Sequence, residues 1–213
     1  MKGPYFISIE GPEGAGKTTL IKKISPFLKN KLDNNFLITR EPGGVKISEE
    51  IRNLVLNKKY PEINARTEAL LFAASRAQHL AEKIIPALKA KKVVICDRFI
   101  DSSTAYQGYG RGLGYQPVYN INYFATRGLM PNLTLLLDLP SKIGLQRINK
   151  YRSNQINRID TDALNFHKKV RQGYLKLASK NPKRIKIIDA TQSSKKIGLD
   201  ALQLIKKGLN GDL

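Results

Sequence analysis

The chain has 213 residues, 41% of them apolar, which is enough to bury a substantial core, and no apolar run is long enough to span a bilayer. Its 37 Lys and Arg residues outnumber 17 Asp and Glu residues, and the net charge of +20 favours anionic partners such as nucleotides, nucleic acid or acidic membranes. The single cysteine, Cys96, excludes an internal disulfide, and with no room for a signal peptide before Tyr5 we expect a cytoplasmic location.

Five short apolar runs are predicted to be strands. Their nearly continuous Val, Ile and Leu content indicates burial on both faces, as in a parallel sheet covered by helices. The runs are Tyr5–Glu10, Phe36–Thr39, Val93–Asp97, Leu133–Leu139 and Ile185–Asp189.

Helical spacing of apolar residues fills the intervals between these strands. The helices are predicted at about residues 17–32, 47–57, 64–90, 117–128, 141–150, 161–180 and 194–208. Ser48 is a candidate cap of the second helix. Pro117 suits a first helical turn, and Gly128 followed by Pro131 ends the same helix. Alternating strands and helices predict one α/β domain over residues 1–213, with a doubly wound five-stranded parallel sheet and helices on both faces.

The segment between the first strand and the first helix is Gly11-Pro-Glu-Gly-Ala-Gly-Lys17-Thr18, which fits the phosphate-loop (P-loop) pattern G-x-x-x-x-G-K-[ST]. Glycines let the backbone wrap a phosphate so that amide groups and the helix N-terminus face the anion. Lys17 would reach the β- and γ-phosphates, and the Thr18 hydroxyl would bind Mg²⁺. A chance glycine-rich turn is the alternative, but a strand precedes the motif and a helix follows it. We therefore predict a P-loop NTPase fold in which a nucleoside triphosphate contacts Gly11, Pro12, Glu13, Gly14, Ala15, Gly16, Lys17 and Thr18.

Polar residues also follow the next two strands, at the edge of the sheet where ligands bind in such folds. Arg40-Glu-Pro-Gly-Gly44 follows the second strand, and Asp97-Arg98-Phe99 ends the third. Asp97 is placed to approach Mg²⁺, and a cap of the following turn is the alternative. Arg98 suits bidentate binding of a phosphate. Cys96 points to the opposite side of the pleat and is predicted to be a packing residue.

These motifs together resemble the thymidylate (dTMP) kinases. The resemblance covers nearly the whole chain and rests on motifs in a fixed order: the P-loop, Arg40-Glu-Pro-Gly-Gly44, Phe72-Ala-Ala-Ser-Arg76, Asp97-Arg-Phe99, Ser102-Ser-Thr-Ala-Tyr-Gln107 and Asp189-Ala-Thr-Gln192. It implies transfer of the γ-phosphoryl group of ATP to dTMP with Mg²⁺, and a homodimer formed through the long helix near 64–90.

The resemblance also implies roles for individual residues. Phe72 would stack on thymine and Arg76 would donate to an exocyclic carbonyl, and their spacing of four puts both on one helix face. For Phe72 alone, core packing is the alternative. Arg40 and Arg98 would hold the dTMP phosphate, and Glu13 would lie near the acceptor phosphate. The sugar and base would be lined by Ser103, Tyr106 and Gln107.

The polar, basic segment at about residues 147–160 resembles the lid that closes over ATP in this family. On composition alone it is a solvated loop. Some family members carry a P-loop arginine where this chain has Ala15, so a lid arginine must supply the catalytic cation. Arg152 is the first candidate, followed by Arg147 and Arg158. Acidic residues usual in the lid are replaced by Asn157 and Asp160, which leaves the lid carboxylate unassigned.

Three alternatives are weaker. Asn30-Lys-Leu-Asp33 spells the guanine-binding pattern N-K-x-D, but it falls at the end of the first helix, whereas that motif follows a much later strand. A kinase for another monophosphate would share the P-loop and Asp-Arg pair, but not the set around Phe72 and Gln107. A basic ATP-dependent nucleic-acid-binding protein needs a recognition motif, and the scattered lysines supply none.

Three further polar residues are assigned no chemistry. Asp138 ends the fourth strand and is predicted to be a structural cap. His79 and His167 lie in helical stretches without ligand-like partners, so no metal–imidazole site is predicted.

Overall fold

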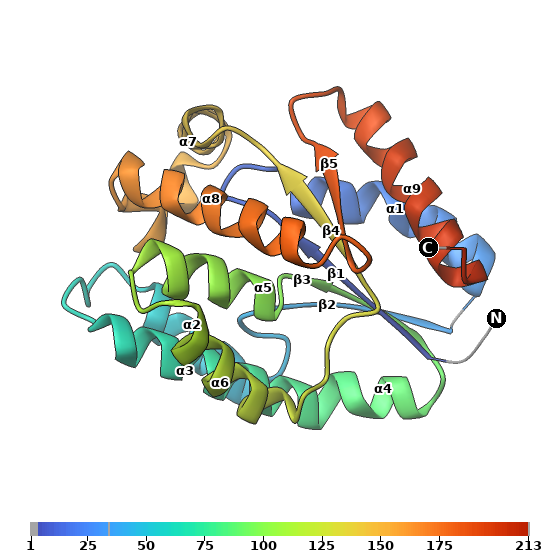
Figure 1. The fold of residues 1–213 in the computed structure, drawn as a ribbon, viewed down its shortest axis with the longest axis horizontal. Helices are drawn as coiled ribbons and strands as arrows, with labels where there is room; N and C mark the ends of the chain where they lie inside the picture. The colour runs from blue at the N-terminus through green and yellow to red at the C-terminus, as the bar shows by residue number, and fades with distance from the viewer. Residues whose placement is uncertain (1–3, 34, 213) are drawn as a thin grey trace.

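A parallel five-stranded sheet forms the centre of the molecule (Figure 1). The structure is a computed structural model, and it describes residues 4–33 and 35–212. The strand order is β2-β3-β1-β4-β5, and each neighbouring pair is parallel. The strands are β1 Tyr5–Glu10, β2 Phe36–Arg40, β3 Val93–Asp97, β4 Leu133–Asp138 and β5 Ile185–Asp189. The predicted sheet is confirmed.

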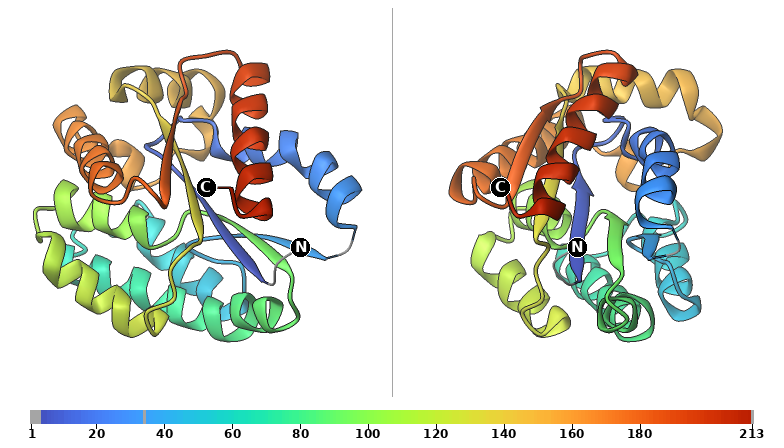
Figure 2. Two further views of the ribbon diagram at one scale, coloured as in Figure 1. Left: turned by 45° about the vertical axis from the view of Figure 1, so that its right-hand side comes forward. Right: turned by 90° about the vertical axis from the view of Figure 1, so that its right-hand side faces the viewer.

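Helices connect the strands and cover both faces of the sheet (Figure 2). They are α1 Lys17–Leu32, α2 Lys46–Leu56, α3 Ala65–His79, α4 Ile85–Lys89, α5 Ile100–Ser103, α6 Tyr115–Thr126, α7 Ser141–Tyr151, α8 Leu164–Lys180 and α9 Ser194–Asn210. Leu80–Ile84 and Thr104–Gly110 are π-helical, and Ser153–Gln155 and Ile159–Thr161 form 3₁₀ turns. Across residues 4–33 and 35–212, every helix is too short or too polar to cross a membrane.

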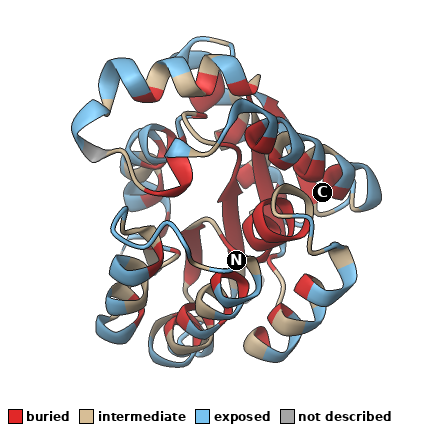
Figure 3. Ribbon diagram, turned by 90° about the vertical axis from the view of Figure 1, so that its left-hand side faces the viewer, coloured by how far each residue is buried: buried red, intermediate tan, exposed pale blue. Residues whose placement is uncertain are grey.

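The alternation of side chains along the strands divides the core between the two faces. Ile7 and Ile9 of β1 pack in a cluster with α1 and α9, whereas Phe6 packs with α4 and the π-helical segment before it. Farther along the second face, Leu136 of β4 packs against α8. Cys96 is fully buried in the second face, as expected of a packing residue. The central strands are buried over most of their length (Figure 3), which explains their nearly continuous apolar sequences.

Ser48 does not cap α2, and this prediction was wrong. Val45 occupies the cap position, and Ser48 lies inside the helix with no exposed surface. Its hydroxyl donates to the carbonyl oxygen of Ser75, 2.8 Å away, and so joins α2 to α3. A serine that satisfies a carbonyl of a neighbouring helix needs no cap position.

Other helix boundaries differ from the predictions by a few residues. The predicted helix 64–90 is α3 and α4 joined through the π-helical segment Leu80–Ile84. The predicted helix 161–180 begins only at Leu164, because a 3₁₀ turn precedes it. Pro117 lies in the first turn of α6, as predicted, and the helix ends at Thr126 with Gly128 just beyond it at φ 74°.

The helical segment at residues 100–110 was not predicted. It consists of α5 and the π-helical segment Thr104–Gly110, and it follows β3 directly. Its buried residues include Ser102, Ser103, Thr104 and Gln107, so the segment lacks the apolar stripe on which helix prediction relies.

Helix α7 packs against the P-loop through a close pair of glycines. A Cβ atom on Gly144 would collide with the carbonyl oxygen of Glu13, and one on Gly14 would collide with the backbone of Gly144. The position of α7, which carries Arg147 and leads to Arg152, therefore depends on these two residues having no side chain.

We predict that Gly144→Ala lowers the free energy of unfolding by about 1–3 kcal/mol, because the methyl group pushes α7 away from the P-loop backbone. Gly198→Ala on α9 is the matched control: its Cβ would meet only the flexible side chain of Lys23, at 2.9 Å. Helix propensity should make the control neutral or stabilising by up to about 1 kcal/mol. Chemical denaturation measures both, and equal effects of the two variants would contradict the glycine contact.

Candidate active site

The P-loop closes around the side chain of Lys17. Gly11, Gly14 and Gly16 have φ angles of 146°, 71° and 90°, which only glycine adopts freely. The Lys17 ammonium donates to the carbonyl oxygens of Gly11 and Pro12, each at 3.2 Å. Burial and the nearby Arg98 lower the pKa of Lys17 to about 8. A cation held inside a loop of backbone amides at a helix N-terminus forms an anion-binding site.

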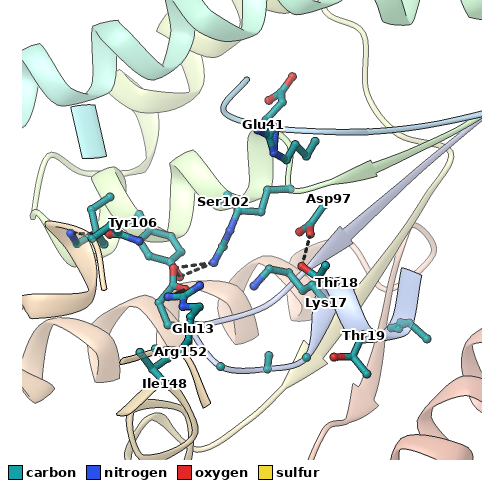
Figure 4. Close-up of a pocket in the computed structure, with 18 of the residues that line it drawn as sticks. Glu13, Lys17, Thr18, Thr19, Glu41, Asp97, Ser102, Tyr106, Ile148 and Arg152 are labelled. Atoms are coloured by element: carbon teal, nitrogen blue, oxygen red, sulfur yellow. Dashed lines mark hydrogen bonds and ion pairs between the residues drawn. The ribbon is translucent and has the colours of Figure 1, made fainter. Parts of the chain in front are cut away.

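Thr18 and Asp97 meet at the end of this loop. In the parallel pairing of β1 with β3, Ile9 is the register partner of Asp97, so the two strand ends lie together. The Thr18 hydroxyl donates to Asp97 Oδ2 at 3.1 Å (Figure 4). A hydroxyl and a carboxylate are oxygen ligands of the type that Mg²⁺ prefers.

Arg98 is held in a strained backbone conformation with its guanidinium over the P-loop. Its φ of 72° is uncommon for a residue other than glycine, and its amide donates to the Ile9 carbonyl at 3.0 Å. The guanidinium donates to Glu13 at 2.7 Å and to the hydroxyls of Tyr106 and Tyr174, each at 3.1 Å. Three separate segments of the chain therefore position one cation.

Glu13 lies at the centre of a cluster of positive charge. Burial alone would raise the pKa of its carboxyl, but Arg98, Lys17 and Arg152 lower that pKa to about 2. Tyr106 also donates to Glu13, at 3.0 Å, and the Arg152 guanidinium lies 3.8 Å away (Figure 4). Glu13 is consequently an anion at all physiological pH values, and it cannot act as a general acid.

The P-loop forms one end of a cleft of about 1000 Å³. The other residues predicted to bind substrate also line this cleft; they are Arg40, Phe72, Arg76, Arg98, Ser103, Tyr106 and Gln107. Phe72 is half-buried, lines the cleft and packs against the apolar cluster that includes α8. Core packing therefore describes part of its surroundings, and stacking on thymine stays a prediction.

Arg76 is buried in the cleft wall, with most of its donors already bonded. It donates to Glu41 at 2.7 Å, to Ser103 at 3.0 Å, to the Phe99 carbonyl at 3.1 Å and to Asn122. A guanidinium has five N–H groups, so these bonds leave one on Nη2 without a partner among the described residues. Only this N–H is available for a ligand.

The chain is similar to known proteins over nearly its whole length. The family model for thymidylate kinase matches residues 9–199. A thymidylate kinase from Oenococcus oeni is 62% identical over 99% of both chains, and one from a Geobacillus species is 57% identical over 90% of both. A crystal structure of thymidylate kinase from Ehrlichia chaffeensis has a TM-score of 0.77 and 32% identity, covering 96% of this chain and 99% of its own.

The chain belongs to the thymidylate kinase family. It is a nucleoside monophosphate kinase, which phosphorylates dTMP to dTDP with ATP. The predicted family, fold and reaction are confirmed.

The three arginines predicted to lie in the lid have different surroundings. Arg147 lines the cleft and donates to the Ala190 carbonyl at 3.2 Å. Arg152 also lines the cleft, donates to Asp160 at 2.6 and 2.7 Å, and has a buried Nε without a partner among the described residues. Arg158 is buried outside the cleft.

The placement of Arg158 argues against its predicted catalytic role. Its Nε donates to the Val55 carbonyl at 3.0 Å, and its Nη2 donates to the buried carboxylate of Glu68. The two partners belong to helices α2 and α3. Among the three candidates, Arg152 is the one whose guanidinium lies beside Glu13, at 3.8 Å, and its catalytic role stays a prediction.

The sequence prediction missed one cation of the cleft rim, Arg52, and one carboxylate beside it, Glu49. Arg52 on α2 lines the cleft and donates to the Pro42 carbonyl at 3.0 Å; burial and the nearby Arg40 lower its pKa. Arg40 itself forms a bidentate pair with Glu49 at 2.7 and 3.0 Å. Arg52 and Glu49 both lie on α2, which carries no recognised motif.

His79 was predicted to lack ligand-like partners, and this prediction was wrong. Polar atoms of Glu41, His79 and Cys96 lie within 4.8 Å of one another. However, His79 Nδ1 shares a hydrogen bond of 3.0 Å with Glu41, and Nε2 shares one of 2.7 Å with Thr39. Both ring nitrogens are occupied, so we assign this cluster a structural role.

Asp138 pairs with Arg171 on α8 at 2.7 and 2.8 Å. It therefore has the structural role that was predicted, although through an ion pair instead of a cap.

Glu10 is a fully buried carboxyl behind Arg98. It accepts hydrogen bonds from the Phe99 amide at 2.7 Å, the Ser102 hydroxyl at 2.5 Å and the Tyr174 hydroxyl at 3.1 Å. Burial, together with the negative charge of the neighbouring Asp101, raises the pKa of the Glu10 carboxyl to about 7. Ser102 and Tyr174 also accept from Arg98, so Glu10 supports that cation indirectly.

We predict that Glu10 makes the protein less stable as the pH rises from about 4.5 to about 7. Its pKa is higher in the folded state, so the folded protein binds the extra proton, and the stabilisation present below pH 4.5 is lost as the pH passes 7. Thermal unfolding of Glu10→Gln, compared with the unaltered protein across this range, isolates the contribution. Between these pH values, the melting temperature of Glu10→Gln should change less in the destabilising direction than that of the unaltered protein. If the melting temperatures of the two proteins follow parallel curves against pH, the raised pKa is contradicted.

Proposed function

We propose that ATP and dTMP bind at opposite ends of the described cleft, with the phosphoryl group transferred beside Glu13. The observation that carries this proposal is the convergence of Lys17, Arg98 and Arg152 on Glu13 at the junction of the two ends. The triphosphate contacts the backbone of residues 11–18 and the Lys17 ammonium.

The acceptor nucleotide occupies the end of the cleft formed by α3 and the π-helical segment Thr104–Gly110. Phe72 stacks on the base, and the last N–H of Arg76 donates to a carbonyl oxygen of thymine. Ser103, Tyr106 and Gln107 line the sugar and base. The acceptor phosphate is held by Arg40 and Arg98, and the position of Arg52 on the same rim supports adding it to this pair.

Thr18 and Asp97 fit a Mg²⁺ site. Their oxygens lie 3.1 Å apart at the end of the P-loop, and both are ligands of the hard type that Mg²⁺ requires. When bound, the ion would neutralise charge on the triphosphate.

Transfer needs positive charge more than it needs a base. An oxygen of the dTMP phosphate is already ionised at neutral pH, so it attacks the γ-phosphorus directly while the bond to the β-phosphate oxygen breaks and ADP leaves. Arg98 and Arg152 neutralise the charge that spreads over the transferring group. The anionic Glu13 holds these two guanidinium groups on either side of it.

We further propose a single kinase domain over residues 1–213, whose lid at about 147–160 brings Arg152 into the cleft, and a cytoplasmic location. The buried thiol of Cys96 is compatible with a reducing compartment.

A homodimer is proposed through α6 and the helices beside it. Phe124 is 87% exposed and Tyr123 is 55% exposed, although both are large and apolar. They border a groove with Leu80 and Ile85 of the neighbouring helical segment, which belongs to the predicted interface helix near 64–90. A second copy of the chain would remove this surface from water.

We predict that Arg152→Ala lowers kcat about 100-fold or more and changes the KM values for ATP and dTMP little, because the cation acts mainly on the transferring group. Lys150→Ala is the matched control, since it removes an equal charge from an exposed position in the same segment. Steady-state kinetics measures both. Raised KM values with an intact kcat would refute the role of Arg152 in the transition state.

We predict that Phe124→Glu makes the protein monomeric, because a charge placed in an apolar interface loses its hydration. Leu199→Glu is the control, since Leu199 is also an exposed apolar residue, 56% exposed, but lies on α9. Light scattering coupled to gel filtration measures the mass of each variant. A dimeric Phe124→Glu variant would exclude this interface.

A further inference from the structure

A carboxylate lies behind the predicted base-binding residues on α3. Glu68 has no exposed surface, and it precedes Phe72 by four residues and Arg76 by eight. Residues with this spacing lie on one face of a helix. Glu68 therefore belongs to the same row as the two residues assigned to thymine, one helical turn farther toward the N-terminus.

Glu68 receives hydrogen bonds from three different side chains. Gln107 Nε2 donates to Oε1 at 2.8 Å, and Arg111 donates to Oε1 at 3.1 Å and to Oε2 at 3.0 Å. Arg158 donates to Oε2. Burial alone would raise the pKa of Glu68, but the bonds from Arg111 and Arg158 lower it below its usual value. The carboxylate is ionised and can only accept hydrogen bonds.

This contact fixes the orientation of the Gln107 amide. A carboxylate accepts from Nε2 but repels Oε1, so only one of the two possible amide orientations is compatible with Glu68. The side chain lines the cleft, and no described residue donates a hydrogen bond to Oε1. The amide therefore offers its carbonyl oxygen to a ligand in the cleft, while Nε2 stays on Glu68.

We propose that Glu68 is a positioning residue for base specificity: it fixes Gln107 so that the amide oxygen accepts from N3–H of thymine and rejects cytosine. The inference rests on the proposed base pocket. Thymine has a donor at N3, whereas cytosine has a lone pair there. Cytosine could be bound only after the amide turned over, and that rotation would place Oε1 against the Glu68 carboxylate. The selectivity against cytosine thus originates in a residue that does not touch the base.

The test is Glu68→Gln, assayed by kcat/KM with dTMP, dUMP and dCMP. A glutamine at position 68 can both donate and accept, so Gln107 can adopt either orientation. The ratio of dTMP to dCMP efficiency should fall about tenfold or more. The ratio of dTMP to dUMP should not change, because uracil and thymine present the same groups at N3 and at both carbonyls. An equal change in both ratios would mean a generally loosened pocket and would overturn the proposal.

Asp162→Asn is the matched control for the charge network. Asp162 pairs with Arg111 at 2.7 and 2.8 Å but does not contact Gln107. Its substitution perturbs the same arginine and leaves the bond between Glu68 and Gln107 intact. Both substrate ratios should stay as in the unaltered protein, and a loss of selectivity against dCMP in this variant would contradict the role of Glu68.

A second variant separates this inference from the base pocket on which it rests. Gln107→Met removes the amide, so it should lower the efficiency with dTMP and dUMP together, and Glu68→Gln should have no further effect on the dTMP to dCMP ratio in that background. If Gln107→Met leaves selectivity unchanged, the pocket assignment fails. If Gln107→Met alters selectivity but Glu68→Gln does not, only the role of Glu68 fails.

Should Glu68→Gln not fold, Glu68→Asp serves in its place, because it keeps the charge and withdraws it from Gln107.

Discussion

The ion pair between Arg98 and Glu13 joins the two loops on which the active site depends. At 2.7 Å, with both side chains mostly buried, it links the residue after β3 to the P-loop after β1. Removing one partner of such a pair typically costs about 3–5 kcal/mol, because the other charge is left buried and alone. The pair also explains why Arg98 is retained in a conformation with φ 72°: this backbone turns the guanidinium back over the P-loop, where Glu13, Tyr106 and Tyr174 hold it.

The parallel sheet makes that pairing possible. Because β1, β2 and β3 run in the same direction and lie side by side, their polar ends emerge at one edge. The β2–β3 register pairs Arg40 with Asp97, and the β1–β3 register pairs Ile9 with Asp97. Lys17, Arg98 and Arg152 lie close together at this edge, and their positive charges repel one another. The ionised carboxylate of Glu13 attracts all three, as its low pKa indicates, and so offsets part of this repulsion before any phosphate is bound.

Features set by local sequence could be predicted, and features set by distant partners could not. The strands and the P-loop are encoded in runs of adjacent residues, and the strand-end motifs follow from them. By contrast, Ser48 bonds to Ser75 and Arg158 bonds to Glu68, contacts that span 27 and 90 residues of sequence. Nothing in the residues beside Arg158 distinguishes it from Arg152, although one bonds to Val55 and Glu68 and the other faces Glu13.

Glu68 contacts both a residue of the cleft wall and a residue of the segment 147–160. Its carboxylate accepts from Gln107 in the cleft and from Arg158 at the end of the lid, and Arg111 links it to Asp162. An ionised group that is fully buried must keep these partners, since each lost hydrogen bond leaves a charge unsatisfied. Arg158 is therefore bonded to the same anion as Gln107. Gln107 and Arg158 therefore share one buried anion, and a change at either side chain removes a hydrogen bond from the carboxylate that the other one contacts.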